Sequence, residues 1–222
     1  MNFNHNQIIT DMENTGIIPV FNHSDVETAK NVLDASYRAG IKVFEFTNRG
    51  EYSLEVFQEL AAHARKYEDL VLGIGTIFTV EDTRRFLEAG ADFVVSPAFV
   101  APVGVYCNSQ QVLWIPGCGT VTEIYNATEL GAQLIKVFPG NVLGPSFVSA
   151  VKAVFPDIQL MPTGGVEPSE KNLQEWFSAG VICVGMGSQL FKKEWIQDKA
   201  FTVLQDQIAQ TLHLIEEIKN KS

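Results

Sequence analysis

The sequence contains few cysteines and histidines, and neither type forms a recognisable pattern. Cys107, Cys118 and Cys183 are an odd number without CxxC spacing, so we interpret them as reduced, buried thiols. The four histidines are His5, His23, His63 and His213. They are scattered, with no HExxH motif and no Asp/His set at predicted strand ends. A catalytic metal is therefore not expected.

Long apolar runs and basic clusters are also absent. No run reaches membrane-spanning length, and residues 1–7 have neither the basic region nor the apolar core of a signal peptide. The formal charge of −10 and the pI near 4.8 argue against nucleic acid as the main partner. We expect a soluble, cytoplasmic protein with a small-molecule partner and neither a nucleic-acid nor a membrane partner.

One local pattern recurs in a chain of otherwise ordinary globular composition. With 222 residues, 46% of them hydrophobic, the chain is long enough for one large domain or two small ones. Four times, an amphipathic segment ends in a glycine that is followed by an apolar run. These glycines are Gly40, Gly90, Gly131 and Gly180. Each fits the left-handed position that ends a helix, which indicates βα units around a parallel sheet.

This pattern predicts eight strands and the helices between them. The predicted strands are residues 17–21, 43–47, 71–76, 93–96, 112–115, 134–138, 159–162 and 182–185. The predicted helices are residues 26–38, 53–67, 80–89, 122–130, 145–154 and 170–179. A leading helix at 6–12 and a long closing helix at 199–219 flank them, and the connection near 102–108 has room for one or two turns.

Eight strands in this length predict an α/β fold, a (β/α)8 TIM barrel that forms a single domain over residues 1–222. An open doubly wound sheet is the alternative. It fits less well because no GxGxxG motif follows the first strand. No linker or change in composition suggests a second domain.

Two charged residues lie within predicted strands. Lys136 has two apolar residues on each side, in a run that ends at Pro139-Gly140. Because strand side chains alternate, Glu45 should point into the barrel, away from Phe44 and Phe46. The same alternation places Lys136 inside, and both should lie toward the carboxyl ends of their strands, where barrel enzymes hold their chemistry.

A buried lysine beside a carboxylate suits Schiff-base chemistry. A lysine attacks a carbonyl only when neutral; at its ordinary pKa about 0.04% of the amine is neutral at pH 7, and a pKa near 7 raises this to about half. Burial favours the neutral amine, whereas an ionised Glu45 opposes it. The pair predicts a nucleophile with a carboxyl proton shuttle. A structural salt bridge is the alternative, as is a lysine that extends to water.

Polar residues and glycines follow several other strands. Arg49, Thr76 and Pro97 come at or just after the ends of the second, third and fourth. Glycine turns follow strands seven and eight, at Thr163-Gly164-Gly165 and Gly185-Met186-Gly187-Ser188. Such turns expose backbone N–H groups that can hold a phosphate, although glycine in an ordinary turn is the simpler reading of either one alone.

These motifs, in this order, closely resemble the 2-keto-3-deoxy-6-phosphogluconate (KDPG) aldolase / 4-hydroxy-2-oxoglutarate (KHG) aldolase family. The resemblance runs from about residue 17 to 191. It rests on Phe44-Glu45-Phe46-Thr47-Asn48-Arg49, Gly73-Ile74-Gly75-Thr76, Ser96-Pro97, Pro116-Gly117-Cys118, Lys136-Val137-Phe138-Pro139-Gly140, Pro162-Thr163-Gly164-Gly165 and Gly185-Met186-Gly187-Ser188.

The resemblance implies a role for each of these positions. Lys136 would form the Schiff base and Glu45 would be the general acid/base. Arg49 and Thr76 would hold the pyruvyl carboxylate, and Pro97 and Phe138 would line the pocket. The phosphate would bind Thr163, Gly164, Gly165, Gly187 and Ser188. No cofactor or metal is implied, and the expected assembly is a homotrimer.

The expected activity is class I aldol cleavage of KDPG to pyruvate and glyceraldehyde 3-phosphate, and also of KHG to pyruvate and glyoxylate. The alternatives are the phosphogalactonate isomer of the substrate, or a barrel that binds a phosphorylated ligand without catalysis. Two positions depart from the family pattern. Ala98 replaces a common glycine, and Asn22-His23 stands where many members carry an arginine, so the preferred C4 stereochemistry stays open.

Overall fold

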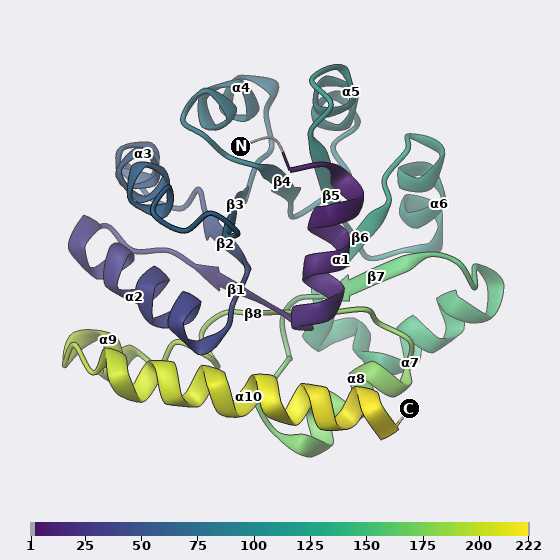
Figure 1. The fold of residues 1–222 in the computed structure, drawn as a ribbon. Helices are drawn as coiled ribbons and strands as arrows, with labels where there is room; N and C mark the ends of the chain where they lie inside the picture. Colours follow the sequence, from purple (N-terminus) through teal and green to yellow (C-terminus); the bar gives the residue numbers. More distant parts are fainter. Residues whose placement is uncertain (1–2, 222) are drawn as a thin grey trace.

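Strands and helices alternate along the part of the chain that the computed structural model describes, residues 3–221 (Figure 1). The strands are β1 (Ile17–Phe21), β2 (Val43–Thr47), β3 (Val71–Gly75), β4 (Phe93–Ser96), β5 (Leu113–Cys118), β6 (Leu134–Val137), β7 (Gln159–Pro162) and β8 (Val184–Met186). The helices are α1 (His5–Thr15), α2 (Val26–Ala39), α3 (Ser53–Ala64), α4 (Val80–Glu88), α5 (Ala101–Ser109), α6 (Val121–Glu129), α7 (Gly140–Val154), α8 (Glu170–Ser178), α9 (Lys193–Gln197) and α10 (Phe201–Lys221).

The strands form one parallel sheet that curls into a nearly closed barrel. Their order is β7-β6-β5-β4-β3-β2-β1-β8. Between β7 and β8 the closure consists of a bridge from Thr163 to Gly185 and a hydrogen bond from Ile182 N–H to Leu160 O, 3.2 Å long. The predicted (β/α)8 barrel is confirmed, and the open doubly wound sheet is wrong.

The four glycines that were predicted to end helices do so. Gly40, Gly90, Gly131 and Gly180 have φ angles of 115°, 104°, 88° and 99°. This left-handed conformation is costly for residues with a Cβ atom. The recurrent pattern therefore marks the true boundaries between helices and the strands that follow.

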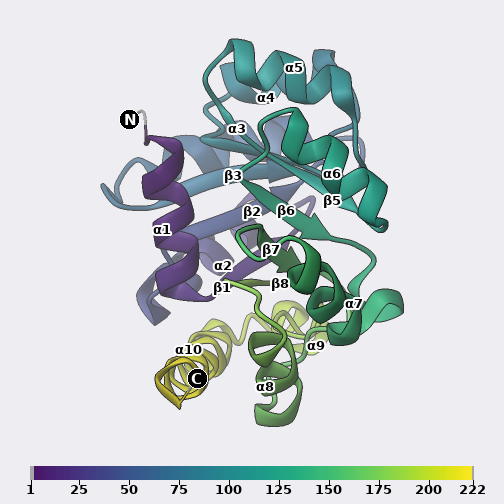
Figure 2. The same cartoon turned by 90° about the vertical axis from the view of Figure 1, so that its right-hand side faces the viewer.

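Two apolar cores lie on opposite sides of the sheet. The interior core contains the first residues of several strands, among them Val43, Val71 and Leu134, together with Ile8 and Met12 of α1. Helix α1 thus closes the amino-terminal end of the barrel (Figures 1 and 2). The outer core joins the other strand face to the surrounding helices and includes Phe44 and Phe46, as strand alternation predicted. Because α1 covers the amino-terminal end, a functional site is expected at the carboxyl ends of the strands.

Tertiary pairing changes the ends of several predicted strands. Strand β5 was predicted to end before Pro116, but Pro116 pairs with Ser96, and Gly117 and Cys118 pair with β6. Strand β3 stops one residue early because Thr76 has a φ of 63°, which is not an extended conformation. Strand β6 also ends one residue early, and β8 begins and ends later than predicted.

Several helix boundaries also differ from the predictions. Helix α7 begins at Gly140 rather than residue 145, but Gly144 is non-helical (φ 71°), so its second part starts where predicted. Helix α3 ends three residues before the predicted end at 67, and the connection near 102–108 is the nine-residue helix α5. The short helix α9 was not predicted, and Lys199, with a φ of 53°, separates it from α10.

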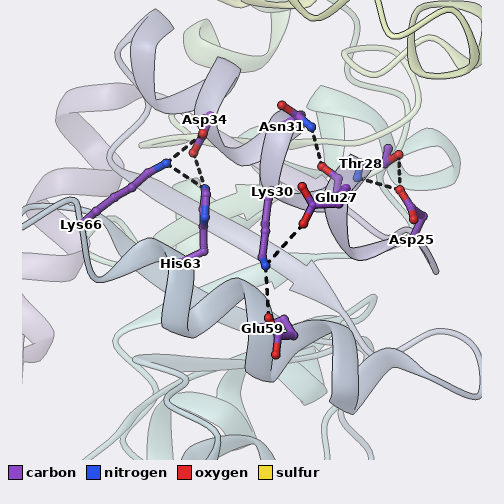
Figure 3. Close-up of polar contacts among 9 residues, drawn as sticks. All are labelled: Asp25, Glu27, Thr28, Lys30, Asn31, Asp34, Glu59, His63 and Lys66. Atoms are coloured by element: carbon purple, nitrogen blue, oxygen red, sulfur yellow. Dashed lines mark hydrogen bonds and ion pairs between the residues drawn. The ribbon is translucent and has the colours of Figure 1, made fainter.

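Polar contacts join helices α2 and α3 on the outside of the barrel (Figure 3). Asp34 of α2 accepts hydrogen bonds from Lys66 (2.9 Å) and Tyr67 (3.0 Å), and His63 Nε2 lies 2.8 Å from it. Desolvation acts to raise the pKa of Asp34, but these hydrogen bonds outweigh it, so the pKa lies below its ordinary value. The contacts help hold α3 against its neighbour. Within residues 3–221, no helix combines the length and the apolar character needed to cross a membrane.

Candidate active site

The two charges inside the predicted strands meet within the barrel. Lys136 of β6 donates a hydrogen bond to Glu45 of β2, with Nζ 3.4 Å from Oε1, although 91 residues separate them in the chain. The side chains are 6% and 1% exposed. The second carboxylate oxygen, Oε2, is buried and has no hydrogen-bond partner among the described residues. A buried carboxylate with one free oxygen, in contact with an amine, is an arrangement suited to proton transfer.

Space for the carboxylate comes from a glycine on the neighbouring strand. A Cβ atom at Gly75 of β3 would lie 1.9 Å from Glu45 Oε1, which is not a possible contact. Glu45 is paired with Gly73 on the same strand. The sequence indicated Gly75 only as part of a motif. The sequence of β3 alone does not show that a side chain of the neighbouring strand β2 occupies the position of a Cβ atom at Gly75.

Phe138 and Pro97 lie close to the lysine. The centroid of the Phe138 ring is 5.7 Å from Lys136 Nζ. Gly117 of β5 pairs with Lys136, and a Cβ atom there would lie 2.4 Å from the carbonyl carbon of Pro97. The end of β4 is therefore packed tightly against the strand beside the lysine. Both side chains are half-buried, as the walls of an open pocket would be.

Arg49 and Thr76 also come together, at the ends of β2 and β3. Arg49 Nε donates a hydrogen bond of 3.3 Å to Thr76 Oγ1. Arg49 is exposed and has no ion pair with a carboxylate in residues 3–221, so its charge is available. A guanidinium beside a hydroxyl group is a common site for a carboxylate.

The glycine turns after β7 and β8 lie side by side at the seam where the barrel closes. Gly164 and Gly165 have φ angles of 89° and 71°. The N–H groups of Gly165 and Ser188 donate no hydrogen bond to any described residue. The hydroxyl of Thr163 is buried and lacks a partner within the same part of the chain. Unused donors at such a turn can bind an anion.

Gly140 connects this seam to the lysine strand. Its N–H donates a hydrogen bond of 2.8 Å to Thr163 O, and a Cβ atom at Gly140 would lie 2.4 Å from Gly164 O. The close approach is possible only for glycine. This residue was missed as a site residue, although the Pro139-Gly140 break after the lysine strand was a signal for it.

Comparison with known proteins identifies the family. The family model described as KDPG and KHG aldolase matches residues 8–207. The chain belongs to this aldolase family. It is therefore a lyase of the Schiff-base class of aldolases.

Individual relatives extend over most of the chain. The 2-dehydro-3-deoxy-phosphogluconate aldolase of Treponema pallidum is 32% identical over 209 residues, which is 94% of this chain and 97% of the relative. The 2-dehydro-3-deoxy-6-phosphogalactonate aldolase of Escherichia coli K12 is 36% identical over 137 residues, 61% of this chain and 66% of the relative. A KDPG aldolase structure from Legionella pneumophila, with pyruvate captured as a covalent carbinolamine, has a TM-score of 0.84 at 25% identity and covers 92% of this chain and 98% of that one.

A second, half-buried lysine of this aldolase lies at the opposite end of the barrel. Lys219 borders a cavity of about 890 Å³ between α8 and α10, and burial lowers its pKa. Its Nζ donates a hydrogen bond to Glu13 O near the end of α1 and lies 5.2 Å from the Phe177 ring centroid. Lys219 therefore helps hold α1 in place. Among residues 3–221 it forms no ion pair with a carboxylate side chain and no hydrogen bond with the residues around Lys136.

Proposed function

We propose that this enzyme catalyses the reversible cleavage of KDPG to pyruvate and glyceraldehyde 3-phosphate, with Lys136 as the nucleophile. The observation that carries the proposal is the buried contact between Lys136 Nζ and Glu45 Oε1, at 3.4 Å. A buried ion pair adds little stability on average, so a pair in this position is better explained by chemistry. If the barrel only bound a ligand without catalysis, the unpaired Oε2 of Glu45 would have no role.

The proposed reaction begins with attack of the neutral Lys136 amine on the C2 ketone of the substrate. Glu45 carries the protons that convert the carbinolamine to an iminium ion and release water. Glu45 then accepts the proton of the C4 hydroxyl as the C3–C4 bond breaks, and the iminium accepts the electron pair. Glyceraldehyde 3-phosphate leaves, and the remaining enamine is protonated at C3 and hydrolysed to pyruvate. Lys136 and Glu45 return to their starting states.

The remaining residues are assigned by position and charge. Arg49 and Thr76 hold the C1 carboxylate, since their contact lies next to β2 and β3, the strands of Glu45 and Gly75. The phosphate binds at the β7–β8 seam, where Thr163, Gly164, Gly165, Gly187 and Ser188 provide hydroxyl and N–H donors. Neutral donors at this seam allow an acidic protein to bind an anionic substrate.

Trapping with borohydride tests this function. Pyruvate and borohydride added to the native enzyme should reduce an imine onto Lys136, which peptide mass spectrometry would locate. Lys136→Ala should leave no adduct. Lys219 is an internal control, because burial lowers its pKa but no carboxylate side chain of residues 3–221 forms an ion pair with it. An adduct on Lys219 or Lys152 in place of Lys136 would overturn the assignment.

Two neighbouring activities deserve separate measurement. The resemblance to a phosphogalactonate aldolase favours the C4 epimer of KDPG as a second substrate candidate. The family model also includes KHG aldolases, whose substrate yields glyoxylate and carries no phosphate. We expect both phosphorylated substrates to give a higher kcat/KM than KHG, because only a phosphorylated substrate uses the donors at the β7–β8 seam.

We further infer a homotrimer. Most exposed large apolar residues of the described chain lie on or just before helices α3 to α7: Tyr52, Phe78, Val80, Val105, Val121, Tyr125, Val142 and Val154. Exposed apolar side chains on these helices are available for contact with other copies of the chain. Light scattering should give about three times the 24.5 kDa mass of the chain, and Phe78→Asp should lower it. A monomer at micromolar concentration would contradict the inference.

A cytoplasmic location fits the cysteines. Cys107, Cys118 and Cys183 are free and buried, and burial raises the pKa of each thiol to about 12. Unpaired thiols of this kind are typical of a reducing compartment. Cell fractionation of the producing organism tests the location.

A further inference from the structure

Asn22 directly follows β1, at a position where the family resemblance implies an arginine in many members. Strand β1 lies between β2, which carries Glu45, and β8, which leads into the turn with Ser188. Ile18 belongs to the interior core, whereas Ile17 and Phe21 belong to the outer core. Strand alternation therefore places the half-buried Asn22 on the interior face, at the mouth of the barrel.

The Asn22 amide has a defined orientation. Its Nδ2 donates a hydrogen bond of 2.8 Å to Thr47 O, at the end of the neighbouring strand. Only the nitrogen of an amide can donate, so Oδ1 must be turned away from Thr47. Oδ1 accepts no hydrogen bond from any residue in the described part of the chain. The side chain thus presents a free acceptor at the barrel mouth.

The adjacent residue, His23, does not face the barrel interior. The His23 ring stacks on Phe21, on the outer side of the sheet, with the ring centroids 6.2 Å apart. Its Nδ1 accepts the N–H of Asp25 at 3.0 Å. This chain therefore has a neutral hydrogen-bond acceptor, and no cation, on the interior face at the end of β1.

The substrate must pass this position if the proposed function holds. Its carboxylate end lies at β2 and β3 and its phosphate at β7 and β8, so the carbons between them run past the end of β1. Glu45 receives the C4 hydroxyl proton, which leaves the C5 hydroxyl as the next donor along the chain of carbons. We propose that Asn22 Oδ1 accepts a hydrogen bond from the C5 hydroxyl and so selects hydroxylated aldehydes.

The test combines one substitution with one change in the aldehyde. Aldol synthesis from pyruvate is measured with glyceraldehyde 3-phosphate and with 3-oxopropyl phosphate, which lacks the hydroxyl that becomes the C5 group. Asn22→Ala should lower kcat/KM about fivefold with glyceraldehyde 3-phosphate and change it little with 3-oxopropyl phosphate, the loss expected for one neutral hydrogen bond. His23→Ala, on the outer side, should change neither.

Asn22→Asp separates hydrogen bonding to the substrate from a purely structural role, in which Asn22 only holds the ends of β1 and β2 together. Aspartate keeps an acceptor oxygen but loses the donor to Thr47 O. It should retain the preference for glyceraldehyde 3-phosphate, even if its negative charge lowers activity with both aldehydes. Equal losses with the two aldehydes in Asn22→Ala, or no loss with either, would overturn the proposal. If those outcomes occur but pyruvate is still trapped normally on Lys136 in the variants, the proposed function stands and only the role of Asn22 is wrong. Failed trapping in the native enzyme would overturn both the proposed function and the role of Asn22.

Discussion

Replacing Glu45 by glutamine removes proton transfer while keeping the shape of the side chain. Glu45 is 1% exposed, contacts Lys136 at 3.4 Å, and fits against Gly75 with no spare room. Glutamine has nearly the same volume, so the barrel interior should remain packed. Removing the negative charge beside the ammonium group also favours the neutral amine. The substitution therefore separates nucleophilic attack from the proton transfers that follow it.

The expected loss of turnover is large. General acid–base catalysis contributes about 10²–10⁴-fold, or roughly 3–5 kcal/mol of transition-state stabilisation. The buried Oε2 of Glu45 has no partner in residues 3–221 that could take over as proton carrier. Bulk water has poor access to a carboxylate that is 1% exposed. We expect the loss in kcat for KDPG cleavage to lie in the upper half of this range.

Two assays on the same preparations check the reasoning. Pyruvate release from KDPG gives kcat, and borohydride trapping of pyruvate reports imine formation. Glu45→Gln should lose turnover yet still be trapped slowly at Lys136, whereas Lys136→Ala should show neither. Near-native turnover in Glu45→Gln would refute the argument. Glu45 would then be a structural partner of the lysine, and the proton carrier would be another group or a water molecule.

Three further outcomes follow from the structure. Gly75→Ala should lower turnover about as much as Glu45→Gln, because its Cβ atom would displace the carboxylate of Glu45. Gly73→Ala crowds the apolar interior instead, so it should lower the free energy of unfolding more than it lowers kcat. Equal losses of kcat in the two variants would contradict this. Burial raises the pKa of Asp92 to about 6, so ionisation destabilises the fold as pH rises from about 4 to 6. Asp92→Asn should therefore raise the free energy of unfolding by up to ~3 kcal/mol above pH 6 and by little near pH 4. Urea titration at the two pH values measures the difference. A gain in stability that does not depend on pH would contradict the role of Asp92 ionisation. Activity should survive exhaustive treatment with EDTA, and loss that a divalent ion restores would point to a metal-dependent aldolase.

Local chemistry in the sequence was sufficient to predict the architecture. The left-handed conformations at Gly40 and Gly180 depend only on the absence of a side chain, and each marks the step from a helix to a strand. Strand alternation depends only on the pleat, so Phe44 and Glu45 could be assigned to opposite faces before any contact was known. Short-range rules of this kind hold wherever the segment lies in the fold.

Boundaries that depend on a neighbouring strand could not be predicted in this way. Strand β5 continues through Pro116 because Ser96 pairs with it, although proline normally predicts the end of a strand. Thr76 ends β3 in a left-handed conformation that its own sequence does not favour. Helix α9 is short, and no residue of it is buried, so it lacks the apolar periodicity by which helices are recognised.

The sequence by itself determined which residues face the barrel interior and which carry charge there. Only the tertiary structure decided that Lys136 and Glu45, 91 residues apart, meet at 3.4 Å, and that Gly75 leaves space for the carboxylate. It also decided that the Asn22 amide turns its nitrogen to Thr47 O. The physical reason is that barrel closure sets distances across strands through the packing of all eight at once, whereas a sequence pattern records only the preferences of each strand.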